Sequence, residues 1–201
     1  MPRKKKSFGT QVYQLKIVLQ DAPVPIWRRL EVKADMSLDV LHEVFQILMG
    51  WEDRHLHAFK TGKAEYHRIM PDPLDRGPNE LDETKYAISD LVKRAGSGFL
   101  YRYDFGDCWE HLVALESTRV VPVQEDGLEF FARCLDGRRA CPPEDVGGVA
   151  GYERFLEVIE DELHPEHRDM VQWIGCRFEP DTFDIRITNQ RLWDLNLAIN
   201  D

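Results

Sequence analysis

Imidazole and carboxylate side chains gather in two short segments of this 201-residue chain. His55 and His57 alternate along the first segment, and Asp104, Asp107 and His111 surround a glycine turn about fifty residues later. Nitrogen and oxygen donors of these types are ordinary ligands for zinc, manganese and iron. If the two segments meet in the fold, they predict a divalent metal site, zinc or manganese, with His55, His57 and His111 as its ligands.

A third segment, residues 141–145, carries two acids and a thiol on a backbone that adjacent prolines hold extended. In a metal-assisted hydrolase, Asp104, Asp107 or Glu144 would be the base that activates water. Cys141 would be a nucleophile only if a histidine lowered its pKa, whereas neighbouring carboxylates raise the pKa of a thiol. We therefore expect Cys141 to be structural.

The segment around Gly106 predicts a β-hairpin with a two-residue turn, at 105–106 or at 106–107, because apolar residues flank it on both sides. Either turn places Arg102 and Asp104 on one face with Trp109 and His111, and directs Tyr101 and Tyr103 to the core face. The predicted ligand-binding residues are these four side chains and two acids of the third segment: Arg102, Asp104, Trp109, His111, Glu144 and Asp145.

A structural interpretation explains much of the same pattern. Asp104 and Asp107 can shape a turn through hydrogen bonds to the backbone, while Trp109 and His111 can belong to the core. An enzyme needs these groups to converge beside an open cavity, whereas a binding module can leave them dispersed.

The charge distribution excludes broad binding of nucleic acid by the folded body. Lys and Arg total 26 against 36 Asp and Glu, for a net charge of −10, and four of the positive charges lie within the first six residues. We expect residues 1–9 to form a flexible basic tail, which could still contact nucleic acid or an acidic partner, and residues 10–201 to form the domain. Trp27, next to Arg28 and Arg29, is expected in the core rather than stacked on a base.

Hydropathy and cysteine spacing indicate a cytoplasmic protein. No stretch approaches the roughly 18 apolar residues that a membrane helix needs, and no apolar signal segment follows the basic start. The four cysteines show no C-x-x-C spacing, so we expect free thiols and no zinc knuckle.

Hydrophobic periodicity predicts the elements. Strands are expected over 12–19, 26–32, 51–60, 64–69, the two hairpin segments as far as 123, and 183–187; helices over 38–48, 89–94, 152–163, from 165 onward and over 189–199. Residues 70–84 are expected to be a functional loop or mobile flap, and the section from 125 to 148 to be irregular. The sequence therefore predicts a single α+β domain, in which a mainly antiparallel sheet from the first ~120 residues packs with helices from the second half.

Five motifs, taken in order, resemble the plasmid pRiA4b ORF-3-like family. They are Trp27-Arg28-Arg29, Gly50-Trp51 with His55-Leu56-His57 and Phe59, Tyr103-Asp104-Phe105-Gly106-Asp107 with Trp109 and His111, Cys141-Pro142-Pro143-Glu144-Asp145 with Gly147-Gly148, and Phe183-Asp184. The resemblance spans about residues 10–200 and implies a compact α+β domain of bacterial or archaeal origin. It also implies a mobile-element setting, because some members are labelled TnpR as passengers of transposable elements; it implies no particular reaction.

Three functional hypotheses follow. We favour a soluble binding or interaction module of plasmid or mobile-element origin, whose polar His/Asp pocket takes a protein partner or a small ligand. A metal-assisted hydrolase is the alternative. A DNA recombinase is the least favoured, because the body is acidic, no serine lies among arginines, and Tyr101 is expected on the face opposite Arg102 and His111.

Overall fold

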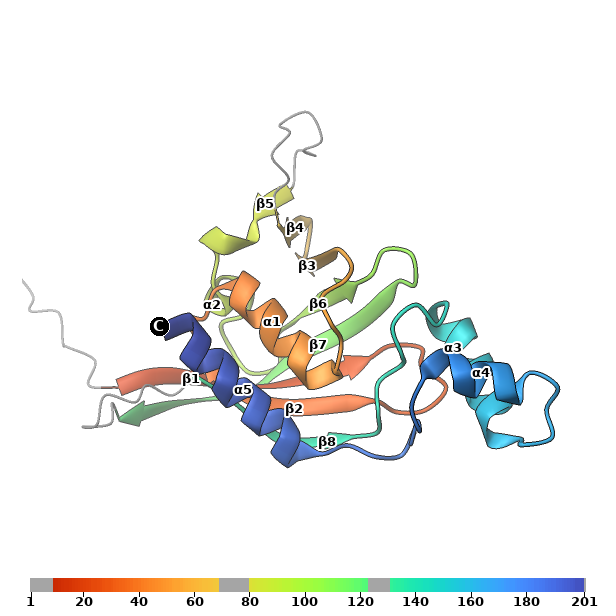
Figure 1. Ribbon diagram of the computed structural model, residues 1–201. Coiled ribbons are helices and arrows are strands. Elements are labelled where there is room, and N and C mark those ends of the chain that lie inside the picture. The colour runs from red at the N-terminus through yellow and green to blue at the C-terminus, as the bar shows by residue number, and fades with distance from the viewer. Residues whose placement is uncertain (1–8, 69–79, 123–130, 201) are drawn as a thin grey trace, which may run out of the picture.

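The structure, a computed structural model, describes residues 9–68, 80–122 and 131–200 as one α+β domain built on a mixed eight-stranded sheet (Figure 1). The strands are β1 (Gly9–Leu19), β2 (Trp27–Lys33), β3 (His57–Thr61), β4 (Ala64–His67), β5 (Glu80–Asp82), β6 (Gly98–Tyr103), β7 (Trp109–Pro122) and β8 (Ala132–Arg138). The helices are α1 (Leu38–Met49), the 3-10 turn η2 (Glu83–Lys85), α2 (Ile88–Leu91), α3 (Gly148–Glu160), α4 (His167–Ile174) and α5 (Ile185–Asn200). The predicted fold class is confirmed.

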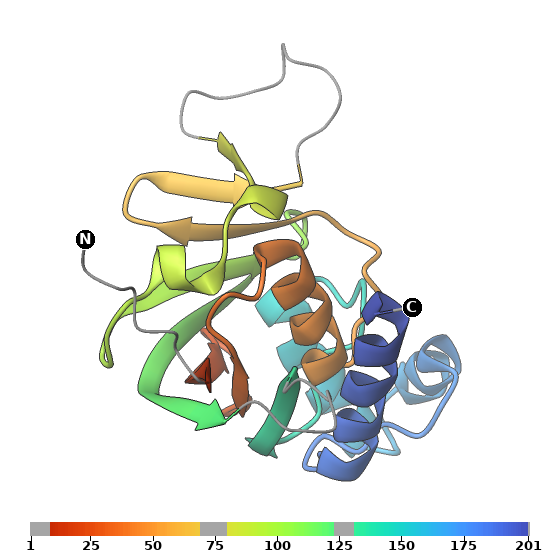
Figure 2. The ribbon, with the colours of Figure 1, turned by 90° about the vertical axis from the view of Figure 1, so that its left-hand side faces the viewer.

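The strands lie in the order β5-β4-β3-β6-β7-β1-β2-β8, and every neighbouring pair is antiparallel except β4 and β5. Helices α1 and α5 cover one face of this sheet, which curls around α1 (Figure 2). The α3–α4 hairpin lies at one end of the sheet, away from α1 (Figure 1). No helix in the described ranges is long and apolar enough to cross a membrane.

Helix α1 forms as the sequence predicts. Its apolar residues recur every three or four positions, so one stripe faces the sheet, and Leu38, Leu41 and Phe45 are fully buried there. The helix ends at Gly50, whose N–H donates to the carbonyl of Gln46. This helix covers the middle of the sheet and forms the centre of the core.

Two predictions for the second half of the chain are wrong. Residues 183–187 are not a strand, because the Asp184 carboxylate accepts hydrogen bonds from the N–H groups of Arg186 and Ile187 and starts α5 at Ile185. The section expected to be irregular contains β8, which lies at the edge of the sheet. Asn189 of α5 exchanges two hydrogen bonds, of 2.8 and 3.0 Å, with the backbone of Cys134 and so occupies part of that edge.

Some strands and loops begin or end at residues other than those predicted. Strand β3 begins at His57, so His55 lies in the loop before it rather than on the strand. The last residues of the expected loop, 80–84, belong to β5 and to η2, which ends at Lys85. The remainder of that loop and residues 1–8 of the expected tail 1–9 lie outside the described residues, while Gly9 begins β1.

Arg28 of β2 is a buried cation that joins three segments. Its guanidinium donates to the carbonyls of Leu48, Arg138 and Arg139 at 2.7–2.9 Å, and to the thiol of Cys141 at 3.2 Å. Only 1% of the residue is exposed. Since a buried charge is tolerated only when its donors are satisfied, these bonds hold the ends of α1 and β8 and the loop that follows β8 against β2.

The aromatic ring of Phe183 covers the other side of this guanidinium, with its centroid 3.9 Å from the Arg28 Cζ. The approach requires Gly137, because a Cβ there would lie 2.5 Å from the Phe183 ring. Trp27, by contrast, is only half-buried and lies beside Lys16 and Arg29. The expectation that Trp27 belongs to the core is wrong, because strand alternation gives the inward position to Arg28.

Replacing Arg28 by methionine should lower the free energy of unfolding by about 3–5 kcal/mol, because several buried carbonyls lose their charged donor. Arg29→Met is the matched control, since Arg29 is half-exposed and pairs with Glu116, and it should cost at most about 1 kcal/mol. Urea unfolding followed by circular dichroism measures both values. Equal losses in the two variants would contradict the role assigned to Arg28.

Candidate functional site

The β6–β7 hairpin has a five-residue loop rather than the expected two-residue turn. Tyr103 pairs with Trp109 and Tyr101 with His111, so the register falls between the two that the sequence predicted. Asp104 and Cys108 take left-handed backbone conformations, with φ of 55° and 58°, and the Cys108 N–H donates to the Asp104 carbonyl at 2.7 Å. Aspartate tolerates this conformation better than most residues.

The changed register reverses the predicted faces. Trp109 and His111 share the buried face with Tyr101 and Tyr103, because directly opposed residues of paired strands point the same way. Arg102 lies on the other face and pairs with Glu110 across the two strands. The prediction that Arg102 and Asp104 share a site face with Trp109 and His111 is therefore wrong.

Three loops nevertheless bring predicted site residues together at one end of the sheet. The Nε2 atom of His55 lies 3.1 Å from Asp145 Oδ1, 3.6 Å from Asp104 Oδ2 and 3.7 Å from Glu144 Oε2. His55 comes from the loop before β3, Asp104 from the hairpin loop, and the two other acids from the loop before α3. We call these four residues the HisAsp site.

Two of these carboxylates are held by one oxygen and present the other. Glu144 Oε1 accepts hydrogen bonds from the Tyr103 hydroxyl and from the backbone N–H of Glu52, at 3.0 and 2.9 Å. Asp104 Oδ1 accepts from the N–H of Gly106 at 2.8 Å. The remaining oxygens, Glu144 Oε2 and Asp104 Oδ2, point to His55. Outer contacts of this kind fix the orientation of donor groups in metal sites.

The spacing of the donor atoms in the HisAsp site fits a metal ion better than direct hydrogen bonds. His55 Nε2 and Glu144 Oε2 are both buried, and neither has a hydrogen-bond partner of good geometry. Ligands at about 2.0–2.2 Å from a metal lie about 3.0 Å apart at right angles and about 3.5 Å apart in a tetrahedron. The distances from His55 Nε2 to Asp145 and Asp104, 3.1 and 3.6 Å, lie close to that range, and the donor atoms of these three residues all lie within 4.8 Å of one another.

Asp107, a candidate base, has a structural position. Its Oδ2 accepts from the N–H of Gly147 at 3.0 Å. The two loops touch so closely that a Cβ on Gly148 would lie 2.6 Å from the Asp107 carbonyl oxygen. Asp107 thus joins the hairpin loop to the loop before α3, and this contact helps to place Glu144 and Asp145 of that second loop beside His55.

Aromatic rings form the floor of the HisAsp site. Trp51 stacks on Tyr103 with centroids 4.8 Å apart and donates its indole N–H to the carbonyl of Pro142 at 2.9 Å. The His55 ring meets the Tyr103 ring edge-on at 5.8 Å. Burial and the neighbouring Glu144 carboxylate raise the pKa of Tyr103, so its hydroxyl remains a donor to Glu144.

His57 belongs to a separate buried cluster. Its Nε2 lies 2.7 Å from Glu83 Oε2, and its ring stacks on His42 with centroids 3.4 Å apart. His42 in turn contacts Asp53 Oδ1 at 2.7 Å and the Tyr101 hydroxyl at 2.7 Å. These are hydrogen-bond distances, shorter than the separation of neighbouring metal ligands, so the cluster is internally satisfied at each histidine Nε2.

Sequence reasoning missed three members of this cluster: His42, Asp53 and Glu83. His42 could have been found, because it falls within the apolar stripe of α1 beside Leu41 and Phe45, where a polar residue must have a buried partner. Nothing in the local pattern around Glu83 indicates that this side chain is fully buried.

The three histidines predicted as one ligand set are not gathered. His55 belongs to the HisAsp site and His57 to the buried cluster, while His111 lies in the core, where its Nδ1 is 3.2 Å from the Tyr101 carbonyl. The physical reason is the hairpin register, which directs His111 inward, and the start of β3 at His57, which separates the two nearby histidines. Cys141 is buried against Arg28, and burial raises the pKa of its thiol.

The model of the plasmid pRiA4b ORF-3-like protein family matches residues 11–187. The chain belongs to this family. Uncharacterized protein y4hQ of Sinorhizobium fredii (strain NBRC 101917 / NGR234) is 34% identical over 165 residues, which are 82% of this chain and 81% of y4hQ. The crystal structure of MM3350, a protein of unknown function from Methanosarcina mazei Go1, superposes on this chain with a TM-score of 0.75 and 35% sequence identity. The match covers 89% of this chain and 97% of the MM3350 chain.

In this pRiA4b ORF-3-like protein, the five motifs that carried the resemblance contact one another. Arg28 joins the first motif to Cys141 of the fourth and Phe183 of the fifth. Trp51 of the second stacks on Tyr103 of the third. Most of these contacts hold the fold, and only part of the motif set reaches the HisAsp site.

Stability should fall as the pH drops from 6.5 toward 4, because burial lowers the pKa of His111 to about 4. The folded state keeps this imidazole neutral, whereas the unfolded chain takes up a proton below its usual pKa of 6.5, so His111 should contribute roughly 2–3 kcal/mol to the loss by pH 4.5. Burial also lowers the pKa of His42 to about 4, with the same sign.

Urea unfolding at pH 7.0 and pH 4.5 measures this dependence. His111→Asn should be less stable at pH 7 and lose less between the two pH values than the unmodified protein. His164→Asn, on the solvent-accessible connection between α3 and α4, is the control and should keep the full dependence. An identical pH dependence for His111→Asn would contradict the buried neutral state of His111.

Proposed function

We propose that this protein is a binding module of plasmid or mobile-element origin that holds a divalent cation at the HisAsp site. The observation that carries the proposal is the buried His55 Nε2, which lacks a hydrogen-bond partner and faces three carboxylate oxygens at 3.1–3.7 Å. The family description, which names a plasmid, supports the origin.

The donor set favours manganese, with zinc as the second choice. Asp104, Asp145 and His55 offer two carboxylate oxygens and one imidazole nitrogen that all lie within 4.8 Å of one another. This mostly hard oxygen set suits manganese, while the imidazole also suits zinc. The three carboxylates repel one another when the site lacks a cation, and a divalent ion offsets that repulsion. Asp145 is the most exposed of the three, with 58% of its side chain accessible.

A binding role fits these residues better than hydrolysis. A hydrolase needs a carboxylate base that is not itself a metal ligand, yet Asp107 is hydrogen-bonded to Gly147, and the free oxygens of Glu144 and Asp104 both face His55 Nε2. A recombinase is less supported still, because Arg102 lies on the face opposite Tyr101 and His111. We therefore propose cation and ligand binding, with neither reaction.

Manganese should bind the untagged protein at one ion per chain and raise its melting temperature. At a hundred times the dissociation constant, the added stability should be about 2.7 kcal/mol. Calorimetric titration with manganese and then with zinc measures the stoichiometry and affinity. His55→Gln and Asp145→Asn should each weaken binding at least tenfold, since each removes one ligand.

His67→Gln is the matched control, because His67 Nε2 lies 3.6 Å from a single carboxylate, that of Glu80, and should leave the affinity unchanged. Binding that survives in both His55→Gln and Asp145→Asn, or the absence of any stoichiometric ion in the unmodified protein, would overturn the proposal.

A further inference from the structure

The acidity of this chain is concentrated in one part of the fold. Residues 144–181, which include α3 and α4, hold eleven acidic residues against three arginines, so they carry −8 of the net charge of −10. All of these residues are in the described part of the chain. This helical hairpin lies at the end of the sheet, away from α1 and α5 (Figure 1). A surface of one sign at one end of a molecule attracts partners of the opposite sign.

Helix α4 lacks a full set of packing partners. None of its eight residues is fully buried, although its sequence is amphipathic. Met170 and Ile174 pack against the core, and the Trp173 ring meets that of Phe155. Val171 is 44% exposed and lines the groove described next, so part of the apolar stripe of this amphipathic helix stays open there.

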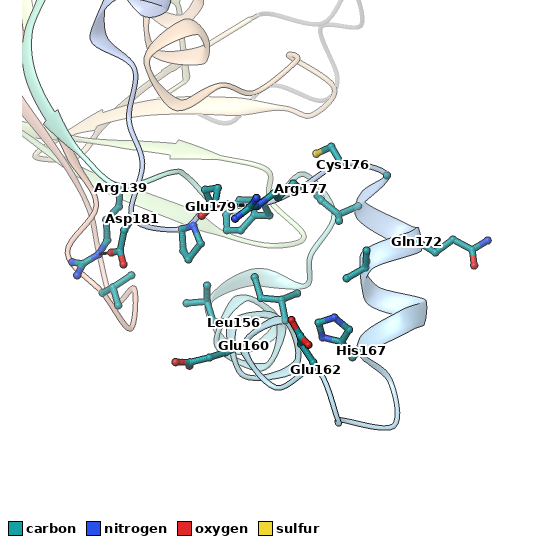
Figure 3. A pocket seen from close by; sticks show the side chains of 17 residues that line it. Arg139, Leu156, Glu160, Glu162, His167, Gln172, Cys176, Arg177, Glu179 and Asp181 are labelled. Atoms are coloured by element: carbon teal, nitrogen blue, oxygen red, sulfur yellow. Dashed lines mark hydrogen bonds and ion pairs between the residues drawn. The ribbon is translucent and has the colours of Figure 1, made fainter.

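A groove of about 1130 Å³ lies between α3, α4 and the segment that follows α4 (Figure 3). Its apolar lining includes Leu156 and Ile159 from α3, Val171 and Ile174 from α4, and Phe178 from the following segment. A groove between helices with apolar side chains in its lining can receive the apolar face of an amphipathic helix.

Two acidic side chains at the rim of the groove form no ion pair within the described residues. Arg139 pairs with Asp181, and Arg177 pairs with Glu179 (Figure 3). Glu160 and Glu162 are exposed, and neither forms an ion pair within the described ranges. The groove therefore offers an apolar floor with uncompensated negative charge at its edge.

We propose that the α3–α4 groove is a docking site for a basic amphipathic helix of a partner protein. The apolar side chains of that helix would cover Val171, Ile159 and Phe178, and its lysines or arginines would face Glu160 and Glu162. Nucleic acid is repelled by the same charges, and so is the hairpin of a second copy of this chain. The groove shares none of its lining residues with the HisAsp site, so the two proposals are tested separately.

A fluorescent 14-residue helical peptide of leucines and lysines, with leucine at i, i+3, i+4 and i+7, is the probe. Anisotropy in about 50 mM salt should show saturable binding to the full chain. A scrambled peptide of the same composition should bind at least tenfold more weakly, because it cannot present one apolar face. Any binding of a labelled single-stranded DNA oligonucleotide should be unaffected by Val171→Ser, because nucleic acid is expected to contact the basic residues 3–6 and not the acidic groove.

Variants locate the binding. The double variant Glu160→Lys with Glu162→Lys should bind the amphipathic peptide at least tenfold more weakly than the unmodified protein. Val171→Ser should bind it about threefold more weakly, or more weakly still. The matched control is Asp35→Lys with Glu43→Lys, which makes the same change in net charge at exposed positions outside the groove and should have a smaller effect. Circular dichroism melting confirms that each variant is folded.

Equal binding of the two peptides, equal weakening by the groove pair and the control pair, or oligonucleotide binding that Val171→Ser weakens would overturn the docking site. Loss of manganese binding in His55→Gln with unchanged peptide binding would leave the docking site intact.

Discussion

The buried guanidinium of Arg28 has no carboxylate partner among the described residues, so carbonyl groups from separate segments must surround it. Because arginine stays charged, removal of this cation from water is tolerated only if the ends of α1 and β8 reach it together. Phe183 then closes over the cation from the start of α5. One side chain thereby fixes the relative positions of β2, α1, β8 and the loop that carries Glu144.

The HisAsp site depends on that arrangement. The loop with Glu144 and Asp145 begins beside Arg28 at Cys141 and is tied to the hairpin loop through Asp107. Trp51 and Tyr103 then support the two loops from beneath. The donors around His55 therefore come from three loops held by contacts outside the site, which is how proteins pre-organise a metal site.

The histidines of this domain fall into two kinds, those buried in the core and His55 on a loop. Histidines inside the fold, such as His42 and His111, are kept neutral by burial and serve packing and hydrogen bonding. His55, on a loop at the edge of the fold, keeps a nitrogen directed at acids. The α3–α4 hairpin lies at one end of the sheet, and residues 144–181 hold eleven of the 36 acidic residues, so the proposed docking groove lies apart from the proposed ion site.

Periodicity by itself determined most of the strands, the long helix α1 and the α+β class, because these depend on which residues must face a core. The clustering of imidazole and carboxylate residues indicated the three segments that meet at His55, although it placed His55 on a strand. Only the tertiary structure decided which side chains face the site, since a one-residue change of register reverses every side chain of a strand. The five-residue loop after Tyr103 turned Trp109 and His111 inward. On β2, the structure buries the side chain of Arg28 in the core, whereas the sequence had indicated the side chain of Trp27. Such choices depend on contacts between residues far apart in the chain, which local patterns do not contain.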